Sequence, residues 1–189
     1  MELNLKGREK LSLNVIVFDF DGVIINSGAD LANAVQYTQR QLGRPVLPKE
    51  EIISYVGRGV ENLIRRSFKG SNEEIIQKAI PIYKEYYYNN CVVDTVLYPN
   101  VKEILEYFKD KKIALVTNKP ENMSRKILEC LNVNQYFDMI IGPESVKNMK
   151  PDPEGLLKVL DTFGESPKKA IMVGDSHTDV EAGKKAGMY

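Results

Sequence analysis

Two aspartates, Asp19 and Asp21, follow the apolar run Val15–Phe18 in the stretch FDFDG. Carboxylates at this spacing can hold a divalent cation, attack an electrophilic centre or exchange protons with a reacting group. The simplest structural alternative is a turn in which the aspartate side chains accept hydrogen bonds from backbone amides. A calcium loop of the EF-hand type is not expected, because no third acidic ligand follows at the right step and no glutamate closes the loop.

Three more polar clusters accompany this aspartate pair. One contains Thr117 and Asn118, one contains Lys150 in the segment KPDP, and one contains Asp175 and Asp179. The first and the last follow short apolar runs, which are typical of strands buried on both faces of a parallel sheet. In such sheets ligands bind beyond the carboxyl ends of the strands. We therefore predict that the clusters and the first aspartate pair converge at one edge of a sheet.

The apolar spacing also predicts the elements that position these clusters. Helical patterns alternate with the apolar runs, which favours a doubly wound α/β fold with a parallel sheet. One helix is expected after Asn100 as N-cap, one from Asp152-Pro153 to Gly164, and one at 178–186, closed by Gly187. The predicted strands are Val15–Phe18, Ile113–Val116, Met139–Ile141 and Ala170–Val173.

One long interval, from residue 19 to residue 112, breaks this alternation. A crossover between parallel strands needs only about a dozen residues, so the interval holds an insertion. Its patterns are helical, with a capping box at Ser71-Asn72-Glu73-Glu74 and no convincing strand, and Pro81 is expected to kink or end one helix. We predict a catalytic core of residues 1–27 and 96–189 and a helical cap of residues 28–95, joined by two hinges.

Composition excludes several classes of function. The chain has 189 residues, of which 43% are hydrophobic and 28% charged, as in globular proteins. Lys+Arg and Asp+Glu both number 26, so no global basic field attracts nucleic acid or an anionic membrane. One histidine and two distant cysteines are too few for a structural zinc site, and reduced, partly buried thiols are favoured over a disulfide. The chain lacks a transmembrane run and the apolar centre of a signal peptide, so we expect a cytoplasmic monomer or homodimer.

The ordered stretches FDFDGVIINS, VTNKP, KPDP and VGDSHTDVEAGKKAG together resemble the four motifs of the haloacid dehalogenase superfamily. The resemblance extends from about Val15 to Tyr189. It implies a HAD-like core and a Mg2+-dependent phosphomonoester hydrolase that acts on a small phosphorylated metabolite through an aspartyl-phosphate. Phosphoryl transfer needs an in-line nucleophile, neutralisation of the phosphoryl oxygens and a proton for the leaving group.

The resemblance also implies the roles of the motif residues. Asp19 is expected to be the nucleophile and Asp21 the general acid and base, while Thr117, Asn118 and Lys150 contact the phosphoryl group or the substrate. Mg2+ is expected at Asp19, Asp175 and the backbone carbonyl of Asp21. Asp179 is expected to orient Lys150 or a metal-bound water.

Within the superfamily, the stretch 55–63 is most similar to phosphoglycolate phosphatases. Arg58 on its Gly-Arg-Gly turn either binds a substrate carboxylate or is a solvated turn residue. Pyrophosphatases and phosphatases of sugar phosphates or nucleotides share this cap type and stay open. Asp21 argues against dehalogenases. A phosphomutase is disfavoured, because the only histidine is His177 rather than one in the helix after the first motif.

The C-terminus departs from the family pattern. Members of the family usually continue past a segment like AGMY with another strand and helix, so we expect the last strand and helix of the family pattern to be missing after Tyr189. The strand Ala170–Val173 is then expected to present unpaired backbone groups at its outer edge, which favours association or local mobility. An inactive phosphate-binding or interaction module is therefore the non-enzymatic alternative. The intact motif residues favour the enzyme.

Overall fold

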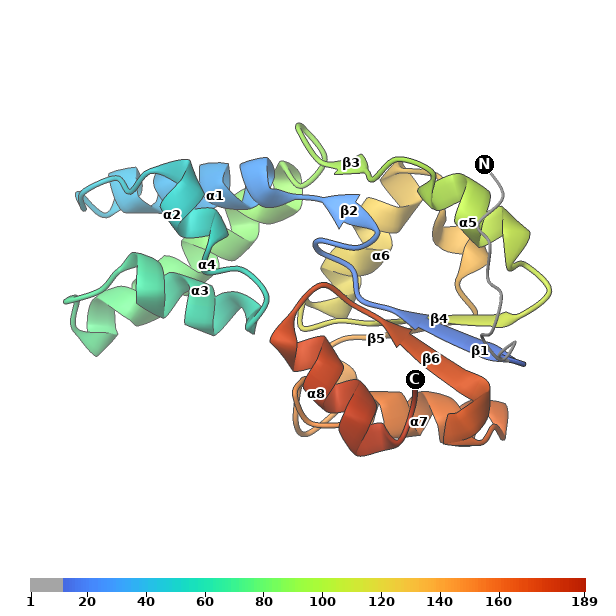
Figure 1. The fold of residues 1–189 in the computed structure, drawn as a ribbon. Helices are drawn as coiled ribbons and strands as arrows, with labels where there is room; N and C mark the ends of the chain where they lie inside the picture. The colour runs from blue at the N-terminus through green and yellow to red at the C-terminus, as the bar shows by residue number, and fades with distance from the viewer. Residues whose placement is uncertain (1–11) are drawn as a thin grey trace.

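A parallel four-stranded sheet forms the centre of the core in the computed structural model, which describes residues 12–189 (Figure 1). Its order is β5-β4-β1-β6, and each neighbouring pair is parallel. The predicted doubly wound α/β fold is confirmed. The strands are β1 (Val15–Phe18), β4 (Lys112–Val116), β5 (Met139–Ile141) and β6 (Ala170–Val173).

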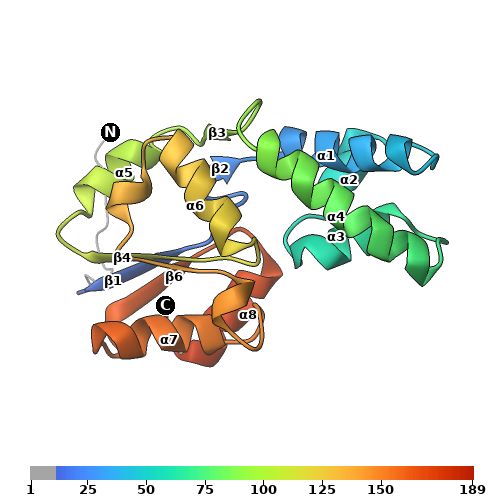
Figure 2. The same ribbon diagram turned by 180° about the vertical axis from the view of Figure 1, so that it is seen from behind.

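Helices cover both faces of this sheet. α5 (Val101–Tyr107) and α6 (Glu121–Cys130) lie on one face, and α7 (Glu154–Phe163) and α8 (His177–Ala186) lie on the other (Figures 1 and 2). Successive side chains of a strand point to opposite faces, so β1 contributes residues to the hydrophobic core on both sides of the sheet. Ile16 and Phe18 pack in the core cluster under α5 and α6, whereas Val15 and Val17 pack with α7 and α8. Burial on both faces explains why the strands are continuous apolar runs.

The ends of the core helices follow the predicted signals with two differences. Gly164 and Gly187 end α7 and α8 in the left-handed conformation, with φ of 65° and 74°. Asn100 precedes α5 as expected, but its φ is 65° and its side chain makes no capping hydrogen bond. Asn at this position is favoured because it tolerates left-handed backbone. Asp152 lies one residue outside the N-cap of α7, and its carboxylate accepts the N–H of Glu154.

A helical segment, residues 28–89, is inserted between β1 and β4 (Figure 1). Two short strands that the sequence analysis missed, β2 (Ile25–Asn26) and β3 (Val96–Leu97), pair antiparallel where the chain leaves and re-enters the core. Two residues are too few to show a strand period, so no pattern predicted them. The division at 27/28 and 95/96 stays a prediction. The segment contains α1 (Gly28–Gln41), α2 (Lys49–Ile53), α3 (Gly59–Ser67) and α4 (Glu73–Asn89).

α4 differs from its prediction at its start and in its middle. Asn72, not Ser71, is the N-cap, and its side chain accepts the N–H of Ile75 at 3.1 Å. The helix continues through Pro81 without ending there. Pro81 lies on the exposed side of α4, and the carbonyl of Gln77 that loses its N–H partner can be solvated there.

Asp30 joins the two connections of the helical segment. Its buried carboxylate accepts hydrogen bonds from the N–H groups of Val93, Asp94 and Thr95 at 2.9 to 3.0 Å and from the Thr95 hydroxyl at 2.8 Å. The start of α1 is thereby tied to the returning chain. Removing one partner of such a buried charged network costs about 1–3 kcal/mol or more.

β6 forms one edge of the sheet, but three of its backbone groups are already paired outside the ladder. The N–H of Ala170 donates to Pro167, and the N–H of Tyr189 donates to the carbonyl of Ala170 at 3.2 Å. The N–H of Met172 donates to the carbonyl of Tyr189 at 2.9 Å. The expectation of an unpaired outer edge is wrong for these groups. The left-handed turn at Gly187 returns the chain alongside β6 and allows the pairing.

Two smaller expectations concern the cysteines and membrane spans. Both thiols are free, and Cys91 is buried whereas Cys130 is exposed rather than partly buried. Within residues 12–189, every helix is too short or too polar to cross a lipid bilayer.

Candidate active site

The register of the sheet brings the predicted clusters together. Phe18 at the end of β1 lies beside Leu115 of β4 and Val173 of β6. The residues that follow these three positions therefore emerge at the same edge. The N–H of Asp19 donates to the carbonyl of Val173 at 2.9 Å, which fixes the start of the first loop against the last strand.

Lys150 lies between two aspartates of different loops. Its Nζ is 2.8 Å from Oδ1 of Asp19 and 2.7 Å from Oδ1 of Asp179, and all three side chains are buried. Oδ1 of Asp19 also accepts the N–H of Phe20 at 2.7 Å. Oδ2 of Asp19 has no hydrogen-bond partner within residues 12–189. One oxygen of Asp19 is thus held in place, and the other is available for chemistry.

The crowding of carboxylates changes their proton affinity. Burial raises the pKa of Asp19 to about 6, and the charge of Asp179 adds to this effect, whereas Lys150 opposes it. Burial and Asp179 also raise the pKa of Asp175. Carboxyl groups that are costly to ionise when the site is empty are stabilised by a nearby cation. The acidic group at this edge therefore favours a bound cation.

The donors fit a hard metal ion such as Mg2+. Carboxylate oxygens of Asp19, Asp175 and Asp179 lie within 4.8 Å of one another. Asp179 uses Oδ1 for Lys150 and Oδ2 for the N–H and hydroxyl of Ser176, so its oxygens are already bonded. This supports the predicted orienting role of Asp179. Asp19 and Asp175 are the more available ligands, and oxygen donors of this kind suit Mg2+.

Gly22 allows the first loop to approach Asp175. A Cβ atom at Gly22 would lie 2.0 Å from Oδ2 of Asp175, and its φ of +89° lies in the region that favours glycine. The glycine of FDFDG is therefore required both for the turn and for the space that the Asp175 carboxylate occupies. The backbone of the first motif, which includes the Asp21 carbonyl that the family resemblance implies as a metal ligand, thus runs directly beside Asp175.

Asp21 is paired with a lysine to which the sequence analysis gave no role. Nζ of Lys119 lies 2.8 and 3.0 Å from the two carboxylate oxygens of Asp21, and the Ser27 hydroxyl donates to the same carboxylate. Lys119 also lies 5.0 Å from the ring centroid of Tyr87. The signal for Lys119 was its place in VTNKP, directly after two polar residues that follow a strand.

Thr117 and Asn118 are both buried beside this group. Oγ1 of Thr117 accepts the N–H of Lys119 at 3.1 Å and leaves its hydroxyl proton for another acceptor. The Asn118 amide donates to the carbonyls of Gly57 and Lys150, both at 3.0 Å. Asn118 therefore connects the core to the turn before α3, and its buried Oδ1 has no partner within the described residues.

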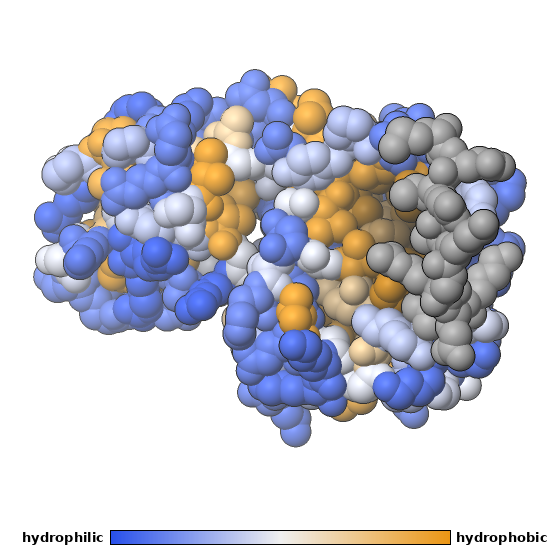
Figure 3. All heavy atoms as spheres, in the orientation of Figure 1, coloured by the Kyte–Doolittle hydropathy of each residue, from blue (hydrophilic) through white to orange (hydrophobic). Residues whose placement is uncertain are grey.

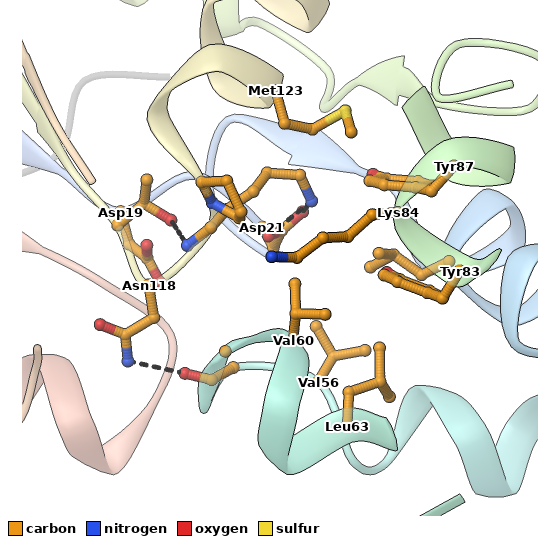
Figure 4. Close-up of a pocket in the computed structure, with 16 residues that line it drawn as sticks. Asp19, Asp21, Val56, Val60, Leu63, Tyr83, Lys84, Tyr87, Asn118 and Met123 are labelled. Carbon is orange, nitrogen blue, oxygen red and sulfur yellow. Dashed lines mark hydrogen bonds and ion pairs between the residues drawn. The ribbon is translucent and has the colours of Figure 1, made fainter. Parts of the chain in front are cut away.

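A cavity lies between these core residues and the helical segment (Figure 4). The space-filling view shows the hollow between the two parts, with hydrophobic residues on the side of the helical segment that faces the core (Figure 3). Asp19, Asp21, Thr117 and Lys119 form its polar end. Its other walls come mainly from apolar residues and α4: Leu31, Val56, Val60, Leu63, Tyr83, Lys84, Tyr87 and Met123.

Arg58 is not brought together with the other predicted site residues. It is exposed and precedes α3, and Gly57 and Gly59 on either side of it line the cavity while Arg58 does not. Its predicted contact with a substrate carboxylate stays a prediction. His177 is exposed at the start of α8, next to Glu181.

The chain is similar to known proteins along nearly all of its length. A family model described as "Haloacid dehalogenase-like hydrolase" matches residues 16–189. A phosphoglycolate phosphatase of Aquifex aeolicus is 39% identical over 177 residues, which cover 93% of this chain and 82% of that protein. One from Nitrosospira multiformis is 33% identical over 186 residues, covering 95% and 82%. The crystal structure of a predicted phosphoglycolate phosphatase from Haemophilus somnus superposes with a TM-score of 0.90 at 30% identity, covering 94% and 83%.

Proposed function

The chain belongs to the haloacid dehalogenase-like hydrolases, as its motifs predicted, and is a phosphatase of that family; from this premise we propose that it hydrolyses 2-phosphoglycolate with Mg2+ as cofactor. The proposal depends mainly on the position of Lys150. Its ammonium group lies between the carboxylates of Asp19 and Asp179 at the carboxyl ends of the strands. The names of the relatives support the choice of substrate.

Asp19 is the proposed nucleophile. Its Oδ1 is held by Lys150 and by the N–H of Phe20, and Oδ2 forms the new bond to phosphorus while the bond from phosphorus to the ester oxygen breaks. Lys150 and the Thr117 hydroxyl stabilise the negative charge of the phosphoryl oxygens in the transition state. The product of this step is an aspartyl-phosphate on Asp19 and the free alcohol.

Asp21 is the proposed acid and base. In its protonated form it gives its proton to the departing ester oxygen, and the resulting carboxylate then takes a proton from the water that attacks the phosphorus of the aspartyl-phosphate, which restores the protonated form. That second step restores the Asp19 carboxylate and releases inorganic phosphate. Lys119 and Ser27 fix the direction of the Asp21 carboxylate toward the cavity.

Asp19, Asp175 and the Asp21 backbone carbonyl would hold Mg2+. When bound, the ion supplies positive charge that offsets the negative charges of the phosphate and the carboxylates. Asp179 does not need to be a metal ligand, because its carboxylate oxygens already accept hydrogen bonds from Lys150 and from Ser176 in the loop that carries Asp175.

The proposal is tested by phosphate release from the purified protein. 2-Phosphoglycolate, pyrophosphate, sugar phosphates and nucleotides are compared with Mg2+ and with EDTA, and Asp19→Asn serves as the inactive control. We expect the highest kcat/KM for 2-phosphoglycolate, and loss of activity with EDTA or in Asp19→Asn. A higher kcat/KM for another ester class would overturn the substrate. No hydrolysis of any ester would overturn the phosphatase and favour the binding module.

A further inference from the structure

α4 contributes a single charged side chain, Lys84, to the cavity among the residues that the structure describes. Tyr83 and Tyr87 on the same helix are buried and line the cavity as well. Residues three apart share a helix face, so Lys84 and Tyr87 are presented together. Figure 4 shows the side chain of Lys84 extending from α4 toward Asp19 and Asp21. The ammonium group therefore faces the reacting end of the cavity.

The wall of the cavity that the helical segment forms holds no carboxylate, so the negative charges of the cavity lie at its other end, on Asp19 and Asp21. Burial raises the pKa of Tyr83 and of Tyr87 well above the ordinary value for a phenol, so both stay neutral. The remaining contribution of the helical segment to the lining is apolar, with Val60 and Leu63 as examples. Within residues 12–189, Lys84 forms no ion pair with a carboxylate.

The other basic groups near the site are already committed or lie outside it. Lys119 is paired with Asp21, and Lys150 is paired with Asp19 and Asp179. Arg58 is exposed and does not line the cavity. A substrate that enters the cavity therefore meets one uncommitted cation on the wall opposite the nucleophile.

We infer that Lys84 determines specificity by binding a carboxylate on the leaving group of the phosphate ester. The phosphate is held at the end of the cavity that contains Asp19, so the leaving group extends past Asp21 toward α4. Lys84 is exposed but lines the cavity, so a carboxylate a few bonds from the ester oxygen then pairs with its ammonium group at the cavity wall. This inference rests on the proposed function and names the residue that gives 2-phosphoglycolate its advantage.

Two esters that differ only at the relevant position test the inference. Ethyl phosphate carries a methyl group where 2-phosphoglycolate carries its carboxylate. We would measure kcat/KM for both esters with the wild type, Lys84→Met, Lys84→Arg and the control Lys78→Met. Lys78 is on the same helix but is exposed and paired with Glu74. Removing one charge-assisted hydrogen bond should lower kcat/KM for 2-phosphoglycolate by about 10- to 100-fold in Lys84→Met.

The inference is decided by comparing how each Lys84 variant changes kcat/KM for 2-phosphoglycolate and for ethyl phosphate. We expect ethyl phosphate to be hydrolysed equally well by the wild type and Lys84→Met, and Lys84→Arg to keep most of the preference for 2-phosphoglycolate. Equal losses for both esters in Lys84→Met would overturn the inference, since Lys84 would then serve the phosphate. No loss for either ester would overturn it as well. Loss of the preference in Lys84→Arg would also count against it, and this variant decides the matter if Lys84→Met fails to fold.

Failure of the inference differs from failure of the proposed function. If the wild type hydrolyses neither ester, the proposed function fails before Lys84 is considered. If the wild type prefers 2-phosphoglycolate and Lys84→Met keeps that preference, the proposed function stands and only the role of Lys84 is rejected.

Discussion

Nζ of Lys119 lies within 3.0 Å of both carboxylate oxygens of Asp21, although the two residues are 98 positions apart in the chain. The pair is nearly enclosed, because the exposed fraction is 4% for the Lys119 side chain and 16% for that of Asp21. Lys119 comes from the loop after β4 and Asp21 from the loop after β1, so the sheet itself aligns them. We predict that Lys119 positions the proposed acid.

Lys119→Met should impair mainly those substrates whose leaving group needs a proton. General acid–base catalysis contributes about 10²- to 10⁴-fold, and misplacing Asp21 should remove part of that from 2-phosphoglycolate. p-Nitrophenyl phosphate has a good leaving group and should lose much less. Steady-state kcat values for the two esters measure the difference, and Lys119→Arg should recover part of the loss. Equal losses for both esters would show that Lys119 does not act through Asp21.

Lys150→Met should destabilise the metal-free protein. The substitution leaves Asp19 and Asp179 buried without their shared counter-charge, and breaking a buried ion pair costs about 3–5 kcal/mol. Urea denaturation of the protein in EDTA measures the free energy of unfolding. The matched control is Lys112→Met, which breaks the exposed pair with Asp138 and should cost only about 0–1 kcal/mol. Equal costs for the two variants would refute a structural role for the Lys150 pair.

Gly22→Ala should weaken Mg2+ binding by displacing Asp175. The added Cβ would lie 2.0 Å from Oδ2 of Asp175, so the Asp175 side chain must move unless the Gly22 backbone shifts. Gly43→Ala is the control, since Gly43 also has a positive φ, +60°, but nothing lies within 4 Å of the added Cβ. Isothermal titration calorimetry with Mg2+ compares the two variants. An unchanged Mg2+ affinity in Gly22→Ala would remove Asp175 from the metal site.

The affinity for Mg2+ should fall as the pH is lowered through about 6. Burial raises the pKa of Asp19 to about 6, so the carboxyl group of the metal-free protein is increasingly protonated below that value. A metal ligand must be deprotonated, so binding at about pH 5 releases a proton that binding at about pH 7.5 does not. Calorimetry in two buffers of different ionisation enthalpy reports the released protons. Proton release that does not change between these pH values would contradict the link to Asp19.

The residues at the strand ends could be predicted because local patterns determine them. Val15–Phe18 and Ala170–Val173 are short apolar runs, and a parallel sheet brings whatever follows them to one edge. Asp19 and Asp175 therefore needed no tertiary information. Gly164 and Gly187 end helices as expected, because the left-handed backbone conformation at a helix C-terminus favours glycine whatever the surrounding fold.

The contacts between distant segments could not be predicted in this way. Asp30 accepts hydrogen bonds from a loop more than sixty positions later, and nothing near Asp30 in the sequence signals that partner. The choice between Arg58 and Lys84 depends on which side chains face the cavity. Both residues are exposed, but Lys84 lines the cavity and Arg58 does not, and the helix pattern around Lys84 predicts only an ordinary solvated position.

The covalent role of Asp19 is the central claim, and trapping the intermediate tests it most directly. The wild type is mixed with 2-phosphoglycolate and Mg2+, quenched in acid during turnover and digested, and the peptide that contains Asp19 is analysed by mass spectrometry. We predict one added phosphoryl group on Asp19 and none in Asp19→Asn. A phosphoryl group on another residue would contradict the account, as would Asp19→Asn turning over at more than about 1% of the wild-type rate.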